Sequence, residues 1–107
     1  MSARTGVITI FRNRLRPEAV KEYAPWADRM VELAATMPGF VSVKTFAAPD
    51  GERVTIAEFE SDEALAAWRE HPEHREAQRL GREEFYSEFE LTTCVPLRAW
   101  TFRRSAT

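Results

Sequence analysis

The sequence predicts an α+β fold of the ferredoxin-like type, in which the elements follow the order β-α-β-β-α-β. Four strand-like segments and two amphipathic helical regions are separated by clear turn signals. The chain has 107 residues, which suits one domain. Right-handed crossovers place both helical regions on one face of a four-stranded antiparallel sheet. We therefore expect a single domain over residues 1–107, with its core at about residues 5–102.

The first strand is predicted at Gly6 to Leu15, whose apolar residues alternate onto both faces of the sheet. Pro17 suits the first turn of the following helix. Apolar residues then recur at three-to-four spacing until the Pro38–Gly39 pair ends the helix. Because Pro25 lies inside this stripe, we expect a kink or a restart near Tyr23–Pro25.

A hairpin is predicted in the middle of the chain. Phe40 to Ala48 and Arg53 to Glu60 have the composition of two strands. Pro49 to Glu52 joins them with a strong turn signal, which contains a glycine. These two strands are therefore expected to be antiparallel neighbours.

The last third is predicted to hold a broken helical region and a long strand. Ser61 is a suitable N-cap for a short helix. His71–Pro72 breaks that helix, and a second helical piece follows until Gly81 closes it. The final strand is expected at Phe89 to Phe102, with a bulge or an unpaired edge position at Pro96.

The predicted sheet has apolar residues on both faces, but the helices cover one face alone. An exposed apolar sheet face of that size is a liability for a monomer. The simplest solution is a homodimer in which the two protomers pack sheet against sheet.

Charge and composition exclude several classes of partner. The 15 basic and 17 acidic residues give a net charge of −2, which argues against nucleic acid. No apolar run has the roughly 18 residues that a membrane span needs. The one cysteine, Cys94, cannot form an intramolecular disulfide, so a cytoplasmic location is expected.

The two histidines are the first candidates for chemistry, because the sequence contains no phosphate loop, nucleophile elbow or metal-binding motif. His71 and His74 lie three residues apart, but Pro72 between them breaks the register that a shared metal would need. No metal site is therefore expected. His74 is a candidate general base, and a structural hydrogen bond is its alternative role.

Asn13 and Trp68 are the other unusual residues. Asn13 lies late in a strand among apolar neighbours, where its amide needs a partner from the protein or from a ligand. Trp68 occupies a position on the helical stripe, where core packing is the usual role. Further aromatic residues offer walls for a planar ligand or, alternatively, a core; they are Phe46, Phe59, Phe85, Tyr86 and Phe89.

Four segments resemble the antibiotic biosynthesis monooxygenase family: Phe11–Ala19 (FRNRLRPEA), Met37–Phe46 (MPGFVSVKTF), Asp50–Val54 (DGERV) and Ala67–His74 (AWREHPEH). The resemblance extends over roughly residues 5–102. It implies a dimeric α+β barrel, in which two ferredoxin-like protomers join their sheets. This agrees with the homodimer predicted from the apolar pattern.

The resemblance also implies a chemistry. Some members of the family oxidise polycyclic phenols or anthrones with O2 and use no metal or flavin. By this resemblance the chain is expected to be a cofactor-independent monooxygenase that acts on a hydroxylated aromatic or quinol-like small molecule. Asn13 and Trp68 would donate hydrogen bonds to the substrate anion, and His74 or Tyr86 would handle the proton. The expected substrate-binding residues are Phe11, Phe46, Phe59, His71, Gln78 and Phe85.

Two alternatives stay open. Another branch of the family binds and degrades haem, and Asn13 and Trp68 match its asparagine and tryptophan. Its iron-ligating histidine would be expected ten residues after the tryptophan, where Gln78 stands, and glutamine is a poor haem ligand. Haem degradation is therefore the second hypothesis. A small-molecule-binding barrel without catalysis is the third.

Overall fold

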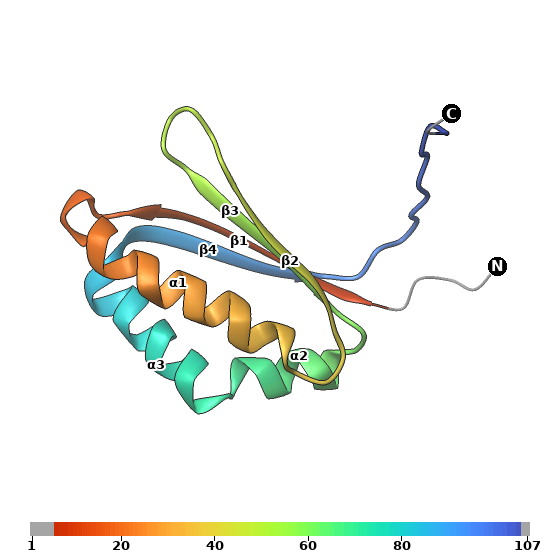
Figure 1. The fold of residues 1–107 in the computed structure, drawn as a ribbon, viewed down its shortest axis with the longest axis horizontal. Coiled ribbons are helices and arrows are strands. Elements are labelled where there is room, and N and C mark those ends of the chain that lie inside the picture. Colours follow the sequence, from red (N-terminus) through yellow and green to blue (C-terminus); the bar gives the residue numbers. More distant parts are fainter. Residues whose placement is uncertain (1–5, 106–107) are drawn as a thin grey trace.

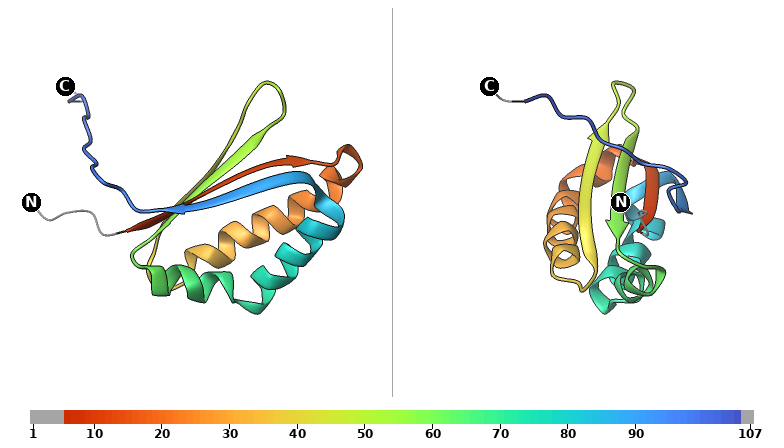
Figure 2. Two further views of the ribbon diagram at one scale, coloured as in Figure 1. Left: turned by 180° about the vertical axis from the view of Figure 1, so that it is seen from behind. Right: turned by 90° about the vertical axis from the view of Figure 1, so that its right-hand side faces the viewer.

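A computed structural model describes residues 6–105 (Figure 1). Its elements are β1 (Val7–Leu15), the 3-10 turn η1 (Pro17–Ala19), α1 (Val20–Ala35), β2 (Phe40–Ala47), β3 (Arg53–Phe59), α2 (Asp62–Arg69), α3 (Pro72–Leu80), the π-helical turn η2 (Gly81–Phe85) and β4 (Tyr86–Cys94). The strands form one antiparallel sheet in the order β2-β3-β1-β4. The helices lie on one side of it, as Figure 2 shows from two directions. The predicted ferredoxin-like architecture is confirmed.

The pairing of β1 with both neighbours defines the two faces of the sheet. Thr9 pairs with Ala57 of β3 and with Thr93 of β4. Because side chains alternate along a strand, residues in register share a face. Odd-numbered β1 residues and their partners face the helices, and even-numbered ones face away.

The packed core occupies one end of the layer between the sheet and the helices. Its buried members are Val7, Ala34, Phe59, Leu65 and Trp68. Phe59 is fully buried and packs edge-to-face on Phe40, with ring centroids 5.8 Å apart. Leu65 and Trp68 come from α2, whose N-cap Ser61 accepts a hydrogen bond from the Ala64 N–H at 3.1 Å.

The boundaries of the last strand differ from the prediction of Phe89 to Phe102. β4 begins at Tyr86, because Gly81 does not end the helix and the π-helical turn runs on to Phe85. β4 ends at Cys94, which pairs with Ile8 next to the first residue of β1. Beyond that point β1 offers no partner, so pairing cannot reach Phe102.

The predicted restart of the helix near Tyr23–Pro25 is also not observed. α1 continues through Pro25 from Val20 to Ala35. The change of helical type lies earlier, between the 3-10 turn Pro17–Ala19 and α1. Pro25 lies in the second turn, where the lost N–H removes a single intrahelical bond.

The face of the sheet away from the helices is apolar at its centre. Ile8, Ile10 and Val54 are half-buried there, and Phe46 is 50% exposed. No described element covers this face (Figures 1 and 2). The chain after β4 extends away from the sheet and carries further exposed apolar side chains; they are Val95, Leu97, Trp100 and Phe102. Within residues 6–105, no helix is long and apolar enough to cross a membrane.

Candidate functional site

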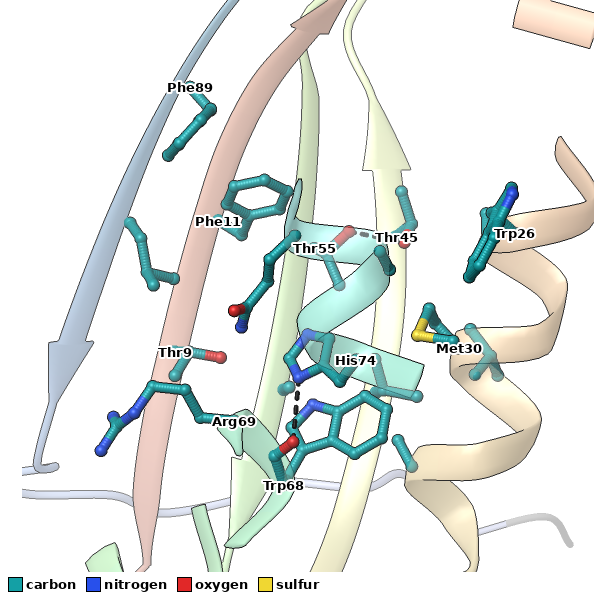
Figure 3. Close-up of a pocket in the computed structure, with 18 of the residues that line it drawn as sticks. Thr9, Phe11, Trp26, Met30, Thr45, Thr55, Trp68, Arg69, His74 and Phe89 are labelled. Atoms are coloured by element: carbon teal, nitrogen blue, oxygen red, sulfur yellow. Dashed lines mark hydrogen bonds between the residues drawn. The ribbon is translucent and has the colours of Figure 1, made fainter. Parts of the chain in front are cut away.

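A cavity of about 430 Å³ lies between the sheet and the helices (Figure 3). Its floor consists of strand residues on the helix-facing side: Thr9, Phe11, Val43, Thr45, Thr55, Ala57, Phe89, Leu91 and Thr93. Many of these are small, so the helices above them leave a hollow instead of a packed core. The helical walls include Tyr23, Trp26, Met30, Leu65, Trp68, Arg69, His74, Ala77, Gln78, Arg82 and Phe85, and β4 adds Tyr86.

Trp68 and His74 form the centre of the helical wall. Their rings stack, with centroids 4.1 Å apart and an interplanar angle of 14°. In Figure 3 the pair lies across the cavity from Phe11, Thr9 and Thr55. Trp68 is near the end of α2 and His74 is in the first turn of α3. The break at Pro72 therefore folds the second helix back and brings the two rings together.

The tautomer of His74 follows from its backbone contact. Its Nδ1 lies 3.0 Å from the carbonyl oxygen of Trp68. A carbonyl oxygen only accepts hydrogen bonds, so Nδ1 carries the proton and donates it. In the neutral ring, Nε2 then has a free lone pair. Burial lowers the pKa of His74 below its ordinary value, so the ring is neutral at pH 7.

Tyr86 belongs to an aromatic cluster at the other end of the cavity. Its ring meets Phe11 edge-on at 5.3 Å and Tyr23 at 5.8 Å. Burial raises the pKa of Tyr86, and the neighbouring Tyr23 hydroxyl raises it further, while the Arg53 charge acts in the opposite direction. Tyr86 therefore keeps its proton at neutral pH and is suited to donate a hydrogen bond, not to act as a base.

Asn13 lies outside this cavity. It is 2% exposed, and neither polar atom of its amide has a hydrogen-bond partner among the described residues. It pairs in register with Arg53 and with Phe89. Phe89 lines the main cavity and also a smaller crevice of about 250 Å³, which Asn13 lines together with Arg12, Glu52, Glu88 and Glu90. Asn13 is thus separated from the Trp68–His74 pair.

Six of the ten predicted site residues line the main cavity; they are Phe11, Trp68, His74, Gln78, Phe85 and Tyr86. They come from β1, α2, α3, η2 and β4. Residues that are far apart in the sequence therefore meet in one space.

Three predicted substrate-binding residues lie elsewhere. Phe46 points to the opposite face of the sheet, because it pairs with Val54 and so shares the face of Arg12. Phe59 is fully buried in the core. His71 caps α3, where its Nδ1 accepts a hydrogen bond from the Glu73 N–H at 3.1 Å.

The sequence analysis missed several cavity residues. Tyr23, Trp26 and Met30 lie at three-to-four spacing on α1, which is equally typical of core packing. Arg69 and Arg82 were missed because exposed arginines are common on helices. All five are identified by their place in the wall of the cavity, which depends on how the helices pack on the sheet. Across residues 6–105, no group of three or more His, Cys, Asp or Glu side chains could hold a metal.

The chain is similar to an uncharacterised protein of Bacillus subtilis (strain 168), YqjZ. The two are 39% identical over 67 residues, a match that covers 63% of this chain and 59% of YqjZ. The chain thus matches less than two thirds of that relative's length.

Solved structures share the fold. Rv0793 from Mycobacterium tuberculosis superimposes with a TM-score of 0.81 at 24% identity, over 90% of this chain and 99% of Rv0793. A mutant of SnoaB, a cofactor-independent oxygenase from Streptomyces nogalater, gives 0.77 at 18% identity, over 89% of this chain and 96% of SnoaB. The sequence profile described as antibiotic biosynthesis monooxygenase matches residues 6–80. The chain belongs to the antibiotic biosynthesis monooxygenase family.

Proposed function

We propose that this protein is a cofactor-independent monooxygenase that oxidises a hydroxylated aromatic or quinol-like molecule with O2. The observation that carries the proposal is the fixed tautomer of His74, which presents the lone pair of Nε2 in a cavity with aromatic walls. The family and its structural neighbour SnoaB, a cofactor-independent oxygenase, support the same reaction class.

His74 acts as the general base in this proposal. Nε2 removes a proton from the phenolic O–H or the activated methylene of the substrate. The imidazolium that forms lies against the face of Trp68, where the electrons of the indole ring stabilise the positive charge. The Trp68 carbonyl keeps its hydrogen bond from Nδ1 throughout, so the base does not rotate.

The substrate anion supplies the electrons for O2. One electron passes to O2, and the two radicals combine to form a C–O bond and a peroxide. The His74 imidazolium then returns its proton to the peroxide. Loss of the remaining proton on that carbon breaks the O–O bond, the departing hydroxide takes up that proton, and the products are a carbonyl and water. Tyr86, which keeps its proton, and the Trp68 indole N–H are suited to stabilise the oxyanion.

Asn13 has a different part in this proposal from that of Trp68. Phe89 lines both the Asn13 crevice and the main cavity, whereas Asn13 lines the crevice alone. We therefore assign Asn13 to the support of the aromatic wall, not to direct contact with the substrate.

The active form is proposed to be a cytoplasmic homodimer that packs through the open face of the sheet. Ile56 and Phe46 are 39% and 50% exposed on that face, and Ile8 and Ile10 lie beside them. Burial of such a patch stabilises association. Light scattering at micromolar concentration should give twice the 12.3 kDa chain mass. Phe46→Glu should shift the mass toward the monomer, whereas a monomeric wild type would contradict the dimer.

Haem binding is the second candidate, and one observation favours it. A histidine that binds a metal usually donates its other ring N–H to a carbonyl, and His74 does this with Trp68. His74 Nε2 would then hold the iron, and the haem would supply O2 activation. Gln78, at the position expected for the family's ligand, also lines the cavity.

Oxygen uptake in the presence of chelator tests the first candidate. A panel of anthrones and naphthohydroquinones should show protein-dependent uptake above autoxidation. Haemin titration tests the second candidate: a sharp Soret band that saturates at one haem per chain, together with no uptake on the panel, would favour haem. Uptake without any such band is the result that the first candidate predicts.

A further inference from the structure

Two arginines line the cavity without an acidic partner. Arg69 ends α2, and Arg82 lies in the π-helical turn. The side chain of neither residue is joined to another described residue by a hydrogen bond or an ion pair. Arg29 on α1 and Arg79 on α3 each bind a glutamate, whereas Arg75 on α3 shares the unpaired state of the two cavity arginines among the described residues but does not line the cavity.

The walls of the cavity carry charge of one sign. No aspartate or glutamate is among the lining residues, although the chain has 17 acidic and 15 basic residues. His74 is neutral at pH 7, so Arg69 and Arg82 are the formal charges of the site. A low-dielectric cavity with positive charge alone attracts and orients anions.

The arginines lie at the rim and the aromatic rings lie inside. Arg69 and Arg82 are both exposed, whereas Trp68 is 8% exposed. In the view of Figure 3 the Arg69 side chain reaches from α2 past Thr9 and across β1 toward β4. A ligand that fits this arrangement has an apolar ring inside the cavity and a charged group at its rim.

We propose that the ligand is a planar aromatic that carries an anionic group, such as a carboxylate, and that this group lies at the rim of the cavity, where Arg69 or Arg82 binds it. The ring lies between the Trp68–His74 stack and the strands. Guanidinium groups suit a carboxylate because they offer paired N–H donors. The identity of the ring rests on the proposed function, whereas the preference for an anion rests on the two arginines.

Calorimetric titration with matched probes tests this preference. 1-Hydroxy-2-naphthoate and 1-naphthol share a ring and differ by the carboxylate. The wild type should bind the acid about tenfold more tightly, as expected for a charge-assisted contact at a partly exposed site. The double variant Arg69→Met/Arg82→Met should lose the preference, and Arg69→Lys/Arg82→Lys should keep part of it.

Arg75→Met is the control, because Arg75 is exposed on α3 and does not line the cavity. It should bind both probes as the wild type does. Equal affinity for the two probes, failure to bind either, or a preference that survives in the methionine double variant would overturn the proposal. Binding needs no turnover, so an acid preference without oxygen uptake would contradict the proposed function alone.

Discussion

The space between the sheet and the helices has two halves, and they differ in one respect. At the end where β3 finishes, the sheet presents Phe59 to the helices and the space is filled. Farther along the same strand it presents Thr55 and Ala57, and the space is hollow. Both halves are covered by amphipathic helices, so the change along β3 from Phe59 to the smaller Ala57 and Thr55 contributes to the hollow.

The largest expected effect is on stability, because a truncation in the packed half should cost more than one in the hollow half. Phe59→Ala should lower the free energy of unfolding by about 3–5 kcal/mol, because it leaves a void in a closed core. Phe11→Ala removes a ring that already borders the cavity, so it should cost roughly half as much or less. Urea unfolding of both variants measures the difference. Equal losses would contradict the division into core and site.

A larger side chain in the floor of the cavity should weaken ligand binding but leave the fold intact. Thr55→Leu enlarges a floor residue and should weaken binding of 1-hydroxy-2-naphthoate by about tenfold or more, since the ligand and the side chain compete for space. Stability should change by less than about 1.5 kcal/mol, even though the hydroxyl contact with Thr45 at 2.8 Å is lost.

Thr92→Leu is the matched control, because Thr92 pairs with Ile10 and so lies on the opposite face. Its affinity for the probe should equal that of the wild type. A similar loss of affinity in both variants would place the ligand outside the cavity.

The pH dependence of turnover should report the lowered pKa of the buried His74 ring. Nε2 is a base only in the neutral ring, so kcat/KM should fall as the pH decreases through the pKa of His74. Burial lowers this pKa, so the midpoint should lie below roughly 6.5 and the rate should be level at pH 7. The profile is corrected for the ionisation of the substrate. A midpoint above 6.5 would show that His74 is not the buried base.

The smallest effect is expected at Asn13. Its buried amide has no partner, so the apolar variant Asn13→Leu should keep or raise the free energy of unfolding, by about 1 kcal/mol at most. Turnover should change by less than about tenfold, because Asn13 does not line the main cavity. A loss of turnover as large as that expected at His74 would place Asn13 in contact with the substrate.

The fold was predictable because turns and apolar periodicity specify the order of the elements. The end of β4 was not, since it depends on where β1 stops offering partners at Ile8. At the site, Trp68 and His74 were predicted singly. Their stacking was not, because the path of the chain after Pro72 decides it.

The positions of Phe46 and Phe59 were likewise not predictable from the sequence. Both are aromatic residues in predicted strands, and register alone places one on the open face and the other in the core. The unpaired state of Arg69 and Arg82 likewise depends on which acidic residues the fold brings near them. Such information is tertiary and has no local signal in the sequence.

The most direct test of the account is oxygen uptake by His74→Gln, measured beside the wild type with anthrone and chelator at pH 7. Loss of the base should lower the protein-dependent rate by about 10²–10⁴-fold. His71→Asn, which keeps a good cap on α3, should retain the wild-type rate. Wild-type uptake in His74→Gln would contradict the central claim that the lone pair of Nε2 begins the reaction.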